Sequence, residues 1–210
     1  AGIFAGLTLA RRGLEPLIIE RGEELSGRDE SVGLFKTERR LNTESNIQFG
    51  EGGAGAYSDG KLTTRINDPL CDAVLNELVT HGAPAGIREK AHPHIGTDLL
   101  KDVVISIRKE IISLGGTVMF GTRLNGAVIK NGALRALLTS NGEIPCETAV
   151  LAIGHSARDT FGALIKNGVE IAPKSFAVGL RIEHLQSDID ACAYREYAGS
   201  PFLGSAEYFH

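Results

Sequence analysis

The stretch I-Q-F-G-E-G-G-A-G-A-Y-S-D-G-K-L-T-T-R, residues 47–65, contains five glycines, at positions 50, 52, 53, 55 and 60. Glycine adopts positive φ readily and lets a backbone come close to a ligand, at an entropic cost to folding. Successive N–H groups in such a loop can form a concave nest for anionic oxygen. A flexible linker would lack the interleaved Phe49, Tyr57 and Leu62. The stretch therefore predicts a loop shaped around a phosphate-bearing or ring-bearing ligand, with a mobile surface loop as the alternative.

Residues 55–61 also fit G-x-x-x-x-G-K, the beginning of a P-loop. The next position is Leu62, where a P-loop has Ser or Thr to hold Mg²⁺. A P-loop must follow a buried strand and open a helix, whereas residues 45–51 are too polar and residues 63–68 lead to Pro69. An ATP-binding P-loop is therefore the weaker interpretation.

The chain has 210 residues, of which 42% are hydrophobic and 23% charged, as in ordinary globular proteins. Its formal net charge of −4 gives no basic surface, so we expect no nucleic-acid partner. No apolar run approaches the roughly 20 residues of a membrane helix and no signal peptide is present, so we expect no membrane association. Cys71, Cys146 and Cys192 form no C-x-x-C and predict reduced thiols in a cytoplasmic protein.

Residues 1–12 predict a helix, which Gly13 ends, and residues 14–20 predict a short buried strand that ends in Glu20. Helix, strand and acid form the second half of a dinucleotide-binding βαβ unit. If Gly2 is the third glycine of G-x-G-x-x-G, Glu20 lies eighteen residues on (20 − 2), near the position that binds a ribose hydroxyl. The first strand would then precede Ala1, and we expect a fragment of a longer protein. An ordinary helix–strand unit with a solvated Glu20 is the alternative.

Residues 23–46 are polar, without clear periodicity, and predict a long irregular excursion to the glycine-rich stretch. Asp68 and Pro69 predict the start of a helix over residues 68–80. His92-Pro93-His94 has no nearby third ligand, so we expect no metal site.

Apolar residues repeat with helical periodicity up to Leu114, and Thr97 or Asp98 can cap this helix. A strand over residues 117–120 follows, and then three strands, at 127–130, 134–139 and 144–147, joined by two Asn-Gly turns. Residues 148–153 form a continuous apolar run that predicts a central parallel strand.

Ser156 and Asp159 have the spacing of a helix cap and predict a helix over residues 157–166. A strand end meeting a helix N-terminus is where open α/β sheets bind ligands. Residues 175–183 alternate in polarity and predict one more strand. His155 is the candidate catalytic residue, with a structural histidine as the alternative.

Six segments carry long and unusual motifs: A-G-I-F-A-G (1–6), I-I-E-R-G (18–22), F-G-E-G-G-A-G-A-Y-S-D-G-K-L (49–62), H-P-H-I-G-T-D (92–98), L-A-I-G-H-S-A-R-D-T-F (151–161) and F-A-V-G-L-R-I-E-H (176–184). Together they resemble a bacterial family of FAD-dependent dehydrogenases, the NAD(FAD)-utilising dehydrogenases. The resemblance covers nearly the whole chain. It implies an α/β, Rossmann-like FAD-binding fold of the glutathione reductase type, in which a parallel sheet carries a β-meander insertion.

The resemblance also implies a domain organisation. Residues 1–66 would be the first part of the FAD-binding domain and 67–95 a helical insertion. Residues 96–160 would be the second part, including the meander, and 161–210 the beginning of a substrate domain.

The resemblance implies FAD contacts along the whole cofactor. Gly2 would face the pyrophosphate, and Glu20 with Arg21 the adenosine ribose. The path from pyrophosphate to isoalloxazine would be lined by Gly52, Gly53, Gly55, Ser58, Asp59, Gly60 and Lys61. Arg123 and Leu124 would contact adenine through their backbone, and Gly154, His155 and Ser156 would form a second contacting strand end. Lys61 or the helix end at Ser156 would stabilise negative charge on the reduced ring.

The implied activity is that of an FAD-dependent oxidoreductase, in which hydride passes between a non-covalent flavin and an unidentified small-molecule substrate or NAD(P)H. No complete second G-x-G-x-x-G is present, so NAD(P)H would bind elsewhere, as a transient reductant, or not at all. Two alternatives stay open. One is an FAD-dependent enzyme that modifies RNA or another macromolecule, and the other is a nucleotide-binding module without redox turnover.

Overall fold

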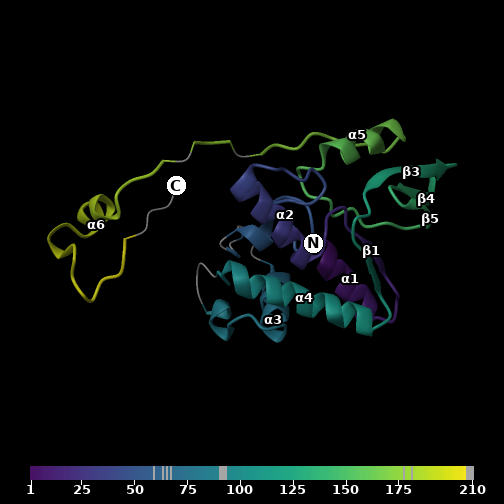
Figure 1. Cartoon of the computed structure of the whole chain (residues 1–210). Coiled ribbons are helices and arrows are strands. Elements are labelled where there is room, and N and C mark those ends of the chain that lie inside the picture. Colours follow the sequence, from purple (N-terminus) through teal and green to yellow (C-terminus); the bar gives the residue numbers. More distant parts are fainter. Residues whose placement is uncertain are drawn as a thin grey trace. The chain divides into compact units, whose positions relative to one another are not determined.

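The computed structural model describes residues 1–58, 60–62, 64, 66, 68–89, 94–176, 178–180 and 182–206. The chain divides into two units, Ala1–Glu170 and Ile171–His210, and each is described by itself (Figure 1). The elements of the first unit, in order, are α1 (Gly2–Arg11), β1 (Leu17–Ile19), α2 (Leu25–Glu38), η1 (Ala54–Tyr57), α3 (Pro69–Thr80), η2 (Ala85–Arg88), α4 (Thr97–Ser113), β2 (Thr117–Met119), β3 (Leu124–Lys130), β4 (Ala133–Thr139), β5 (Gly142–Pro145) and α5 (Arg158–Lys166). The unit is therefore of the mixed α/β class that the sequence predicts.

Strands β1 and β2 pair in parallel, with Leu17 opposite Thr117 and Ile19 opposite Met119. Helices α1 and α4 pack against each other beside this pair (Figure 1). Their shared core consists of Leu7 and Ala10 from α1 with Val103, Ile107 and Ile111 from α4, and Ile18 of β1 packs against it. The small parallel sheet and the helix that precedes it are both confirmed.

Helix α2 contradicts the prediction of an irregular excursion over residues 23–46. Its buried residues are Leu25, Arg28 and Val32, so a charged side chain lies in the middle of its buried face. This charge interrupts the apolar repeat on which the prediction of a helix depends.

Helix α3 begins as predicted, because the Asp68 side chain accepts a hydrogen bond from the N–H of Leu70 at 2.8 Å and Pro69 follows it. The predicted cap of α4 is wrong. Gly96, with φ of 87°, is the N-cap and no side chain caps the helix. The Thr97 hydroxyl instead donates to the carbonyl of Ser58 at 3.3 Å.

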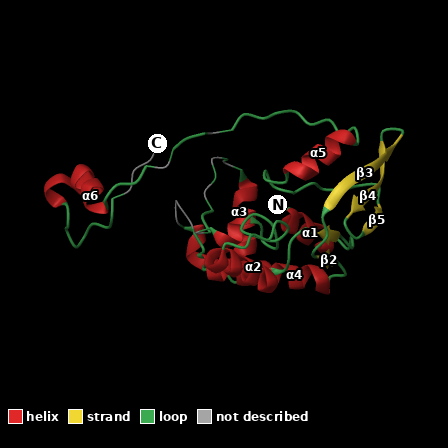
Figure 2. Ribbon diagram, turned by 45° about the horizontal axis from the view of Figure 1, so that its top comes forward, coloured by secondary structure: helices red, strands yellow, loops and turns green. Residues whose placement is uncertain are grey.

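Strands β3, β4 and β5 form the predicted antiparallel meander, and α5 lies along β3 (Figure 2). Leu124 and Ala127 of β3 are buried together with Leu164 of α5. Asn131 and Gly132 have φ of 54° and 73°, which are the positive values that a tight Asn-Gly hairpin turn requires.

Residues 148–153 form no strand, which contradicts the prediction of a central parallel strand there. Val150 and Leu151 are 65% and 49% exposed. A strand needs a hydrogen-bonded neighbour to satisfy its backbone groups. In the described structure, residues 148–153 pair with neither β1 nor β2, so their apolar composition alone does not produce a strand.

The predicted capping box before α5 is also wrong, because Ala157 is the N-cap and no side chain caps the helix. The carboxylate of Asp159 instead accepts from Arg21, at 2.9 Å, and from the N–H of Thr160, also at 2.9 Å. The backbone oxygen of Ser156 accepts from the N–H of Arg158. The carboxylate is therefore used by a distant side chain.

The second unit contains α6 (Gln186–Tyr194) and η3 (Arg195–Tyr197). The described residues between 175 and 183 form no strand, so that prediction is wrong as well. Phe176, Val178 and Leu180 are 83%, 83% and 95% exposed, and this unit offers them no strand among its described residues. Across the described part of the chain, no helix is long and apolar enough to cross a membrane.

Candidate functional site

Glu20 lies directly after β1, where the parallel strand ends. Its backbone N–H donates to Met119, which continues the pairing with β2 by one residue. Its Oε1 accepts hydrogen bonds from the N–H groups of Gly22 and Gly50, both at 2.9 Å. One carboxylate oxygen therefore fastens the glycine-rich stretch to the end of the strand. Within the described residues, the other oxygen, Oε2, has no hydrogen-bond partner.

The first turn of α1 lies beside the same stretch. Ile3 packs against the buried cluster of Leu25, Ala56 and Val104, and Ala56 belongs to η1. The first turn has no acidic residue and no side-chain cap, so its N–H groups and the positive end of the helix dipole are left for an anion. Gly2, which begins the helix, lies against Ala152, because an added Cβ would be 3.4 Å from the Cβ of that residue.

Two of the close-packed glycines are required by packing within the protein. A Cβ on Gly22 would lie 2.5 Å from the Cα of Gly50, and a Cβ on Gly50 would lie 2.5 Å from Cδ of Arg28. Gly50 also has φ of 119°, which side chains rarely tolerate. These glycines bring the loop against β1 and α2, so they do not by themselves indicate a ligand.

The following residues have a different character. Gly52 and Gly53 have φ of 83° and 63°, and an added Cβ at Gly53 or Gly55 would meet no atom within 4 Å. In the described structure, the N–H groups of Gly52, Ala54 and Gly55 take no hydrogen-bond partner. Exposed N–H groups beside open space are what an anionic or ring-edge acceptor requires. No strand precedes this loop, which contradicts the P-loop interpretation.

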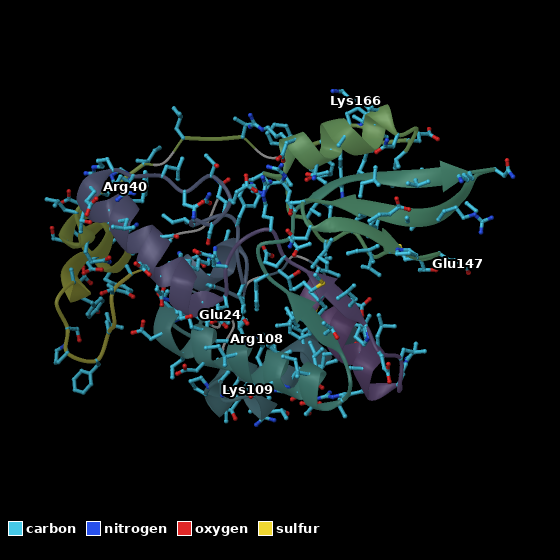
Figure 3. The ribbon with its side chains drawn as sticks, turned by 45° about the vertical axis from the view of Figure 1, so that its right-hand side comes forward. Glu24, Arg40, Arg108, Lys109, Glu147 and Lys166 are labelled. Atoms are coloured by element: carbon cyan, nitrogen blue, oxygen red, sulfur yellow. The ribbon has the colours of Figure 1, made fainter. Side chains whose placement is uncertain are left out.

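Glu51 is 5% exposed and joins the loop to two helices. Its Oε2 accepts from the N–H of Leu25 at the start of α2, at 3.0 Å, and its Oε1 accepts from Nε of Arg108 at 2.6 Å. Arg108, on α4, also reaches Glu24 at 3.4 Å (Figure 3). The carboxylate therefore satisfies an unpaired helix N–H and a cation at once.

Arg28 of α2 is fully buried and binds the loop from the other side. Its guanidinium donates to the carbonyls of Asn46, Ile47, Gly50 and Glu51. It also lies over the ring of Tyr57, 4.6 Å from the centroid. Arg28, on α2, donates to carbonyls of the loop, and Glu51, in the loop, accepts from an N–H of α2. The two residues therefore bind α2 and the loop to each other.

Tyr57 lies between two cations, since Nζ of Lys101 is also 4.6 Å from its centroid. Its hydroxyl donates to Asp29, and Lys101 reaches the same carboxylate oxygen at 2.5 Å. Burial and the hydrogen bond to Asp29 raise the pKa of Tyr57, so the phenol stays protonated. Burial alone would raise the pKa of Asp29, but hydrogen bonds from Lys101 and Tyr57 lower it.

Arg21 connects the strand end to α5 and to the segment before the loop. Its guanidinium stacks on Phe49, 4.2 Å from the centroid, and pairs with Glu44 at 3.1 Å and Asp159 at 2.9 Å. Glu44 in turn pairs with Arg123 at 3.1 Å. The hydrogen bond from Arg21 lowers the pKa of Asp159. Through Glu44, these ion pairs bring Arg123 close to Arg21, which directly follows Glu20.

The backbone groups of Arg123 and Leu124 have protein partners. The N–H of Arg123 donates to Ser140 Oγ at 3.0 Å, and its carbonyl accepts from the N–H of Ser140 at 2.9 Å. The carbonyl of Leu124 accepts from the Thr160 hydroxyl at 3.3 Å. Contact with a ligand through these groups would therefore have to replace or share existing hydrogen bonds.

Ser58, Gly60 and Lys61 close the loop against the start of α4. Ser58 Oγ donates to the carbonyl of Gly55 at 3.0 Å, and the carbonyl of Gly60 accepts from Ile95 at 3.1 Å. Lys61 forms an antiparallel bridge with His94. Asp59 lies outside the described residues, as do His92 and Pro93. No group of three or more metal-binding side chains occurs in the part of the chain that is described.

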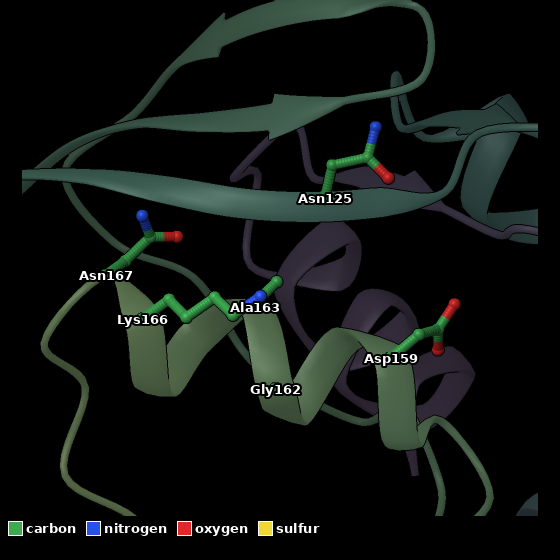
Figure 4. Close-up of a pocket in the computed structure, with 6 residues that line it drawn as sticks. All are labelled: Asn125, Asp159, Gly162, Ala163, Lys166 and Asn167. Atoms are coloured by element: carbon green, nitrogen blue, oxygen red, sulfur yellow. The ribbon is translucent and has the colours of Figure 1, made fainter.

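Gly154, His155 and Ser156 lie between the apolar run and α5. Gly154 has φ of 71°, and both it and His155 are exposed. A shallow groove borders α5 on its β3 side and is lined by Asn125, Asp159, Gly162, Ala163, Lys166 and Asn167 (Figure 4). The Asn167 side chain already accepts from the N–H of Ala127 at 2.9 Å. The groove brings no candidate catalytic pair together.

Sequence reasoning missed three residues that build this site: Arg28, Glu44 and Glu51. Glu51 offered a signal, because a carboxylate inside a run of glycines is conspicuous. The other two offered none, because the partners of Glu44 are distant in sequence and those of Arg28 are backbone carbonyls.

Comparison with known proteins finds a family match for the C-terminal residues and one relative that spans almost the whole chain. Residues 175–210 match a family model described as FAD-dependent protein, C-terminal domain-like. An uncharacterized protein of Clostridium beijerinckii is 51% identical over 208 residues, which cover 99% of this chain and 39% of that protein. The chain therefore spans about two fifths of the length of this curated relative.

Solved structures show weaker likeness. L-proline dehydrogenase from P. horikoshii aligns over 81% of this chain and 54% of its own, with 14% identity and a TM-score of 0.43. L-amino acid deaminase from Proteus myxofaciens, solved in complex with anthranilate, aligns over 80% and 46%, with 15% identity and a TM-score of 0.40. Glycine oxidase from Bacillus cereus aligns over 64% and 53%, with 14% identity and a TM-score of 0.35.

Proposed function

We propose that this chain forms the FAD-binding part of an FAD-dependent oxidoreductase. The observation that carries the proposal is the convergence of three features: the carboxylate of Glu20 after a parallel strand, the uncapped first turn of α1, and a glycine-rich loop with N–H groups that have no partner among the described residues. Dinucleotide-binding folds use an acid at a strand end for ribose and a helix N-terminus for pyrophosphate. The match of residues 175–210 to an FAD-dependent family supports the same conclusion independently.

The donor set fits this cofactor. The N–H groups at Gly2 and in the following turn suit a pyrophosphate, and Oε2 of Glu20 suits a ribose hydroxyl, because Oε1 is occupied by two backbone N–H groups. The loop N–H groups of Gly52, Ala54 and Gly55 suit an electron-rich ring edge or a phosphate. Ser58, Asp59, Gly60 and Lys61 would border that part of the site, and Gly154, His155 and Ser156 would close it from the α5 side.

In this proposal the residues up to 66 and residues 96–160 form the FAD-binding domain. Residues 67–95 form a helical insertion, and residues 161–210 begin the substrate domain. FAD, when bound, supplies hydride acceptance and donation. The chain itself orients the cofactor through Glu20 and the loop, and presents fixed N–H dipoles. The substrate is a small molecule, and NAD(P)H would act only as a transient reductant.

The first test is a visible absorption spectrum of the purified intact protein, recorded before and after anaerobic NADH or NADPH. Flavin bands that bleach support a flavoenzyme reduced by pyridine nucleotide. Bands that persist keep FAD and make the reductant a substrate still to be identified. If no flavin is present, even after reconstitution with FAD, the proposal fails.

A substitution at Glu20 tests the site itself. Glu20→Gln keeps an oxygen for the N–H groups of Gly22 and Gly50 and replaces the second acceptor by an N–H donor. We expect its FAD dissociation constant to rise about ten- to a hundredfold, because a hydrogen bond to a charged group contributes about 1.5–3 kcal/mol. Glu143→Gln, in exposed β5, is the matched control and should leave FAD affinity unchanged. Equal affinity in both variants would remove Glu20 from the site.

A further inference from the structure

Arg28 is a buried cation whose donors are all directed at one loop. It is 0% exposed. Nε donates to the carbonyl of Asn46 at 2.8 Å and Nη2 to that of Ile47 at 3.0 Å. Nη1 donates to Glu51 at 2.5 Å and to Gly50 at 3.3 Å. Among the described residues the guanidinium forms no ion pair, so four carbonyl oxygens satisfy the buried charge.

Such a residue is costly if its only task is to fill space. Burying a charge without an ion pair is unfavourable, and an apolar side chain of similar volume would serve the packing of α2 at least as well. Leu25 and Val32, on the same buried face, illustrate that alternative. What Arg28 adds is the orientation of four backbone carbonyls within residues 46–51. No apolar side chain can provide this.

The orientation of these carbonyls bears on the N–H groups that follow. The carbonyls of Asn46, Ile47, Gly50 and Glu51 face Arg28. Immediately after them come the N–H groups of residues 52, 54 and 55, which have no hydrogen-bond partner among the described residues. Gly50 lies directly against the Arg28 side chain, and Tyr57, at the far end of the loop, lies under its guanidinium. Arg28 therefore contacts the loop on both sides of the turn that carries the free donors.

We infer that Arg28 is the positioning residue of the glycine loop, holding residues 46–57 in the one conformation that presents their N–H groups to the ligand. The inference rests on the proposed function for the identity of that ligand, FAD. Arg28 touches neither cofactor nor substrate and acts only through the loop. Lysine cannot replace it, because one ammonium group with three donors cannot reach four carbonyls spread over a planar fork.

The test compares Arg28→Lys with Val32→Ala in the intact protein. Val32 is 3% exposed on the same helix, so its truncation removes packing without touching the loop carbonyls. FAD affinity, the visible circular dichroism of bound flavin and the thermal unfolding temperature are measured for both. We expect Arg28→Lys to weaken FAD binding tenfold or more and to change the flavin circular dichroism, in accordance with a displaced loop. Val32→Ala should lower the unfolding temperature without either effect.

A second variant guards against an Arg28 substitution that does not fold. Gly50→Ala places a Cβ against Cδ of Arg28 and should produce the same flavin signature from the loop side. The inference is overturned if Arg28→Lys and Gly50→Ala both keep the wild-type FAD affinity and flavin circular dichroism. It is also overturned if Val32→Ala changes these two properties as much as Arg28→Lys does.

Hydrogen exchange separates this inference from the proposed function. If the wild-type protein binds no FAD after reconstitution, the proposed function fails, and amide exchange then decides the role of Arg28. Faster exchange confined to peptides within residues 46–57 in Arg28→Lys, and absent in Val32→Ala, supports the positioning role. Unchanged exchange, or faster exchange throughout the molecule, overturns it.

Discussion

Arg21 and Asp159 are 138 positions apart in sequence, yet their side chains form a two-pronged ion pair. Nη1 donates to Oδ1 at 3.0 Å and Nη2 to Oδ2 at 2.9 Å. The planar guanidinium matches a carboxylate in this geometry, which fixes direction as well as distance. The pair holds the first turn of α5 to the end of β1.

A double-mutant cycle measures this pair. Arg21→Lys and Asp159→Asn should each destabilise the protein modestly, with a coupling energy of about 0.5–1 kcal/mol. The value is small because the Asp159 side chain is 53% exposed. Urea unfolding of the wild type, both single variants and the double variant provides the four free energies. Arg135 and Glu147, 3.9 Å apart and exposed, form the control pair and should show no measurable coupling. Equal coupling in both pairs would contradict the prediction.

The contact between Arg11 and Glu110 should make the free energy of unfolding depend on pH in the acidic range. The hydrogen bond from Arg11, at 2.5 Å, lowers the pKa of Glu110 below its unfolded value. A carboxylate with a lowered folded pKa contributes stability above its unfolded pKa, and this contribution is lost as the pH falls through the folded pKa. The free energy of unfolding should therefore fall more steeply between about pH 6 and about pH 3 in the wild type than in Glu110→Gln. Parallel pH profiles would show that Arg11 does not stabilise the charged form.

Local signals in the sequence predict a large part of this fold. Asp68-Pro69 predicts the start of α3 because the cap needs only its own neighbours. The Asn-Gly pairs predict the two hairpins of the meander, and Asn131-Gly132 has the geometry of a tight turn, whereas Gly142 already begins β5. Periodicity predicts the helix before β1, and the short apolar run predicts β1 itself. The parallel sheet is what the family resemblance implies.

The wrong predictions share one physical cause, which is that distant partners decide the outcome. The apolar run at 148–153 and the alternating residues at 175–183 have the composition of strands, but a strand also needs an adjacent edge. Asp159 has the spacing of a cap, but Arg21 takes its carboxylate. Helix α2 lacks an apolar repeat because Arg28 binds a loop that follows it in sequence.

One part of the candidate site could be predicted from the sequence, and another part could not. Glu20 and the glycine-rich stretch are conspicuous in the sequence, and the structure joins them through one carboxylate oxygen. That joint could not be predicted, because residues 20 and 50 have no periodic relation. The cofactor contacts assigned to Gly52, Gly53, Gly55, Ser58, Gly60 and Lys61 stay predictions that flavin binding must test.

Replacement by alanine should have opposite effects on the free energy of unfolding at Gly22 and at Gly33. Gly22→Ala places a methyl group 2.5 Å from the Cα of Gly50, which forces the loop away from β1. We expect a loss of about 1–3 kcal/mol in the free energy of unfolding. Gly33→Ala, in α2, meets no atom within 4 Å and should stabilise the helix by about 0.5–1 kcal/mol. Thermal and urea unfolding of both variants provide the comparison, and a mild effect at Gly22 would contradict the close packing.

Glu51 and Glu24 both pair with Arg108, yet they should differ in their importance for stability. Glu51 is buried and also accepts from the N–H of Leu25, whereas the Glu24 side chain is 49% exposed. Glu51→Gln weakens a buried charged contact and should cost about 2 kcal/mol, because Arg108 keeps solvent and Glu24 as partners. Glu24→Gln should cost less than about 0.5 kcal/mol, as is usual for an exposed pair.

The free energy of unfolding in urea measures both effects, and hydrogen exchange at the first turn of α2 locates them. If Glu51 stabilises the start of that helix, the amide of Leu25 should exchange faster in Glu51→Gln and not in Glu24→Gln. Equal losses of stability would mean that the contact with Arg108, rather than burial against α2, determines the contribution of Glu51. In that case the loop would be held to α2 chiefly by Arg28 and by the hydrogen bond from Tyr57 to Asp29, and Arg28→Lys should loosen it more than Glu51→Gln does.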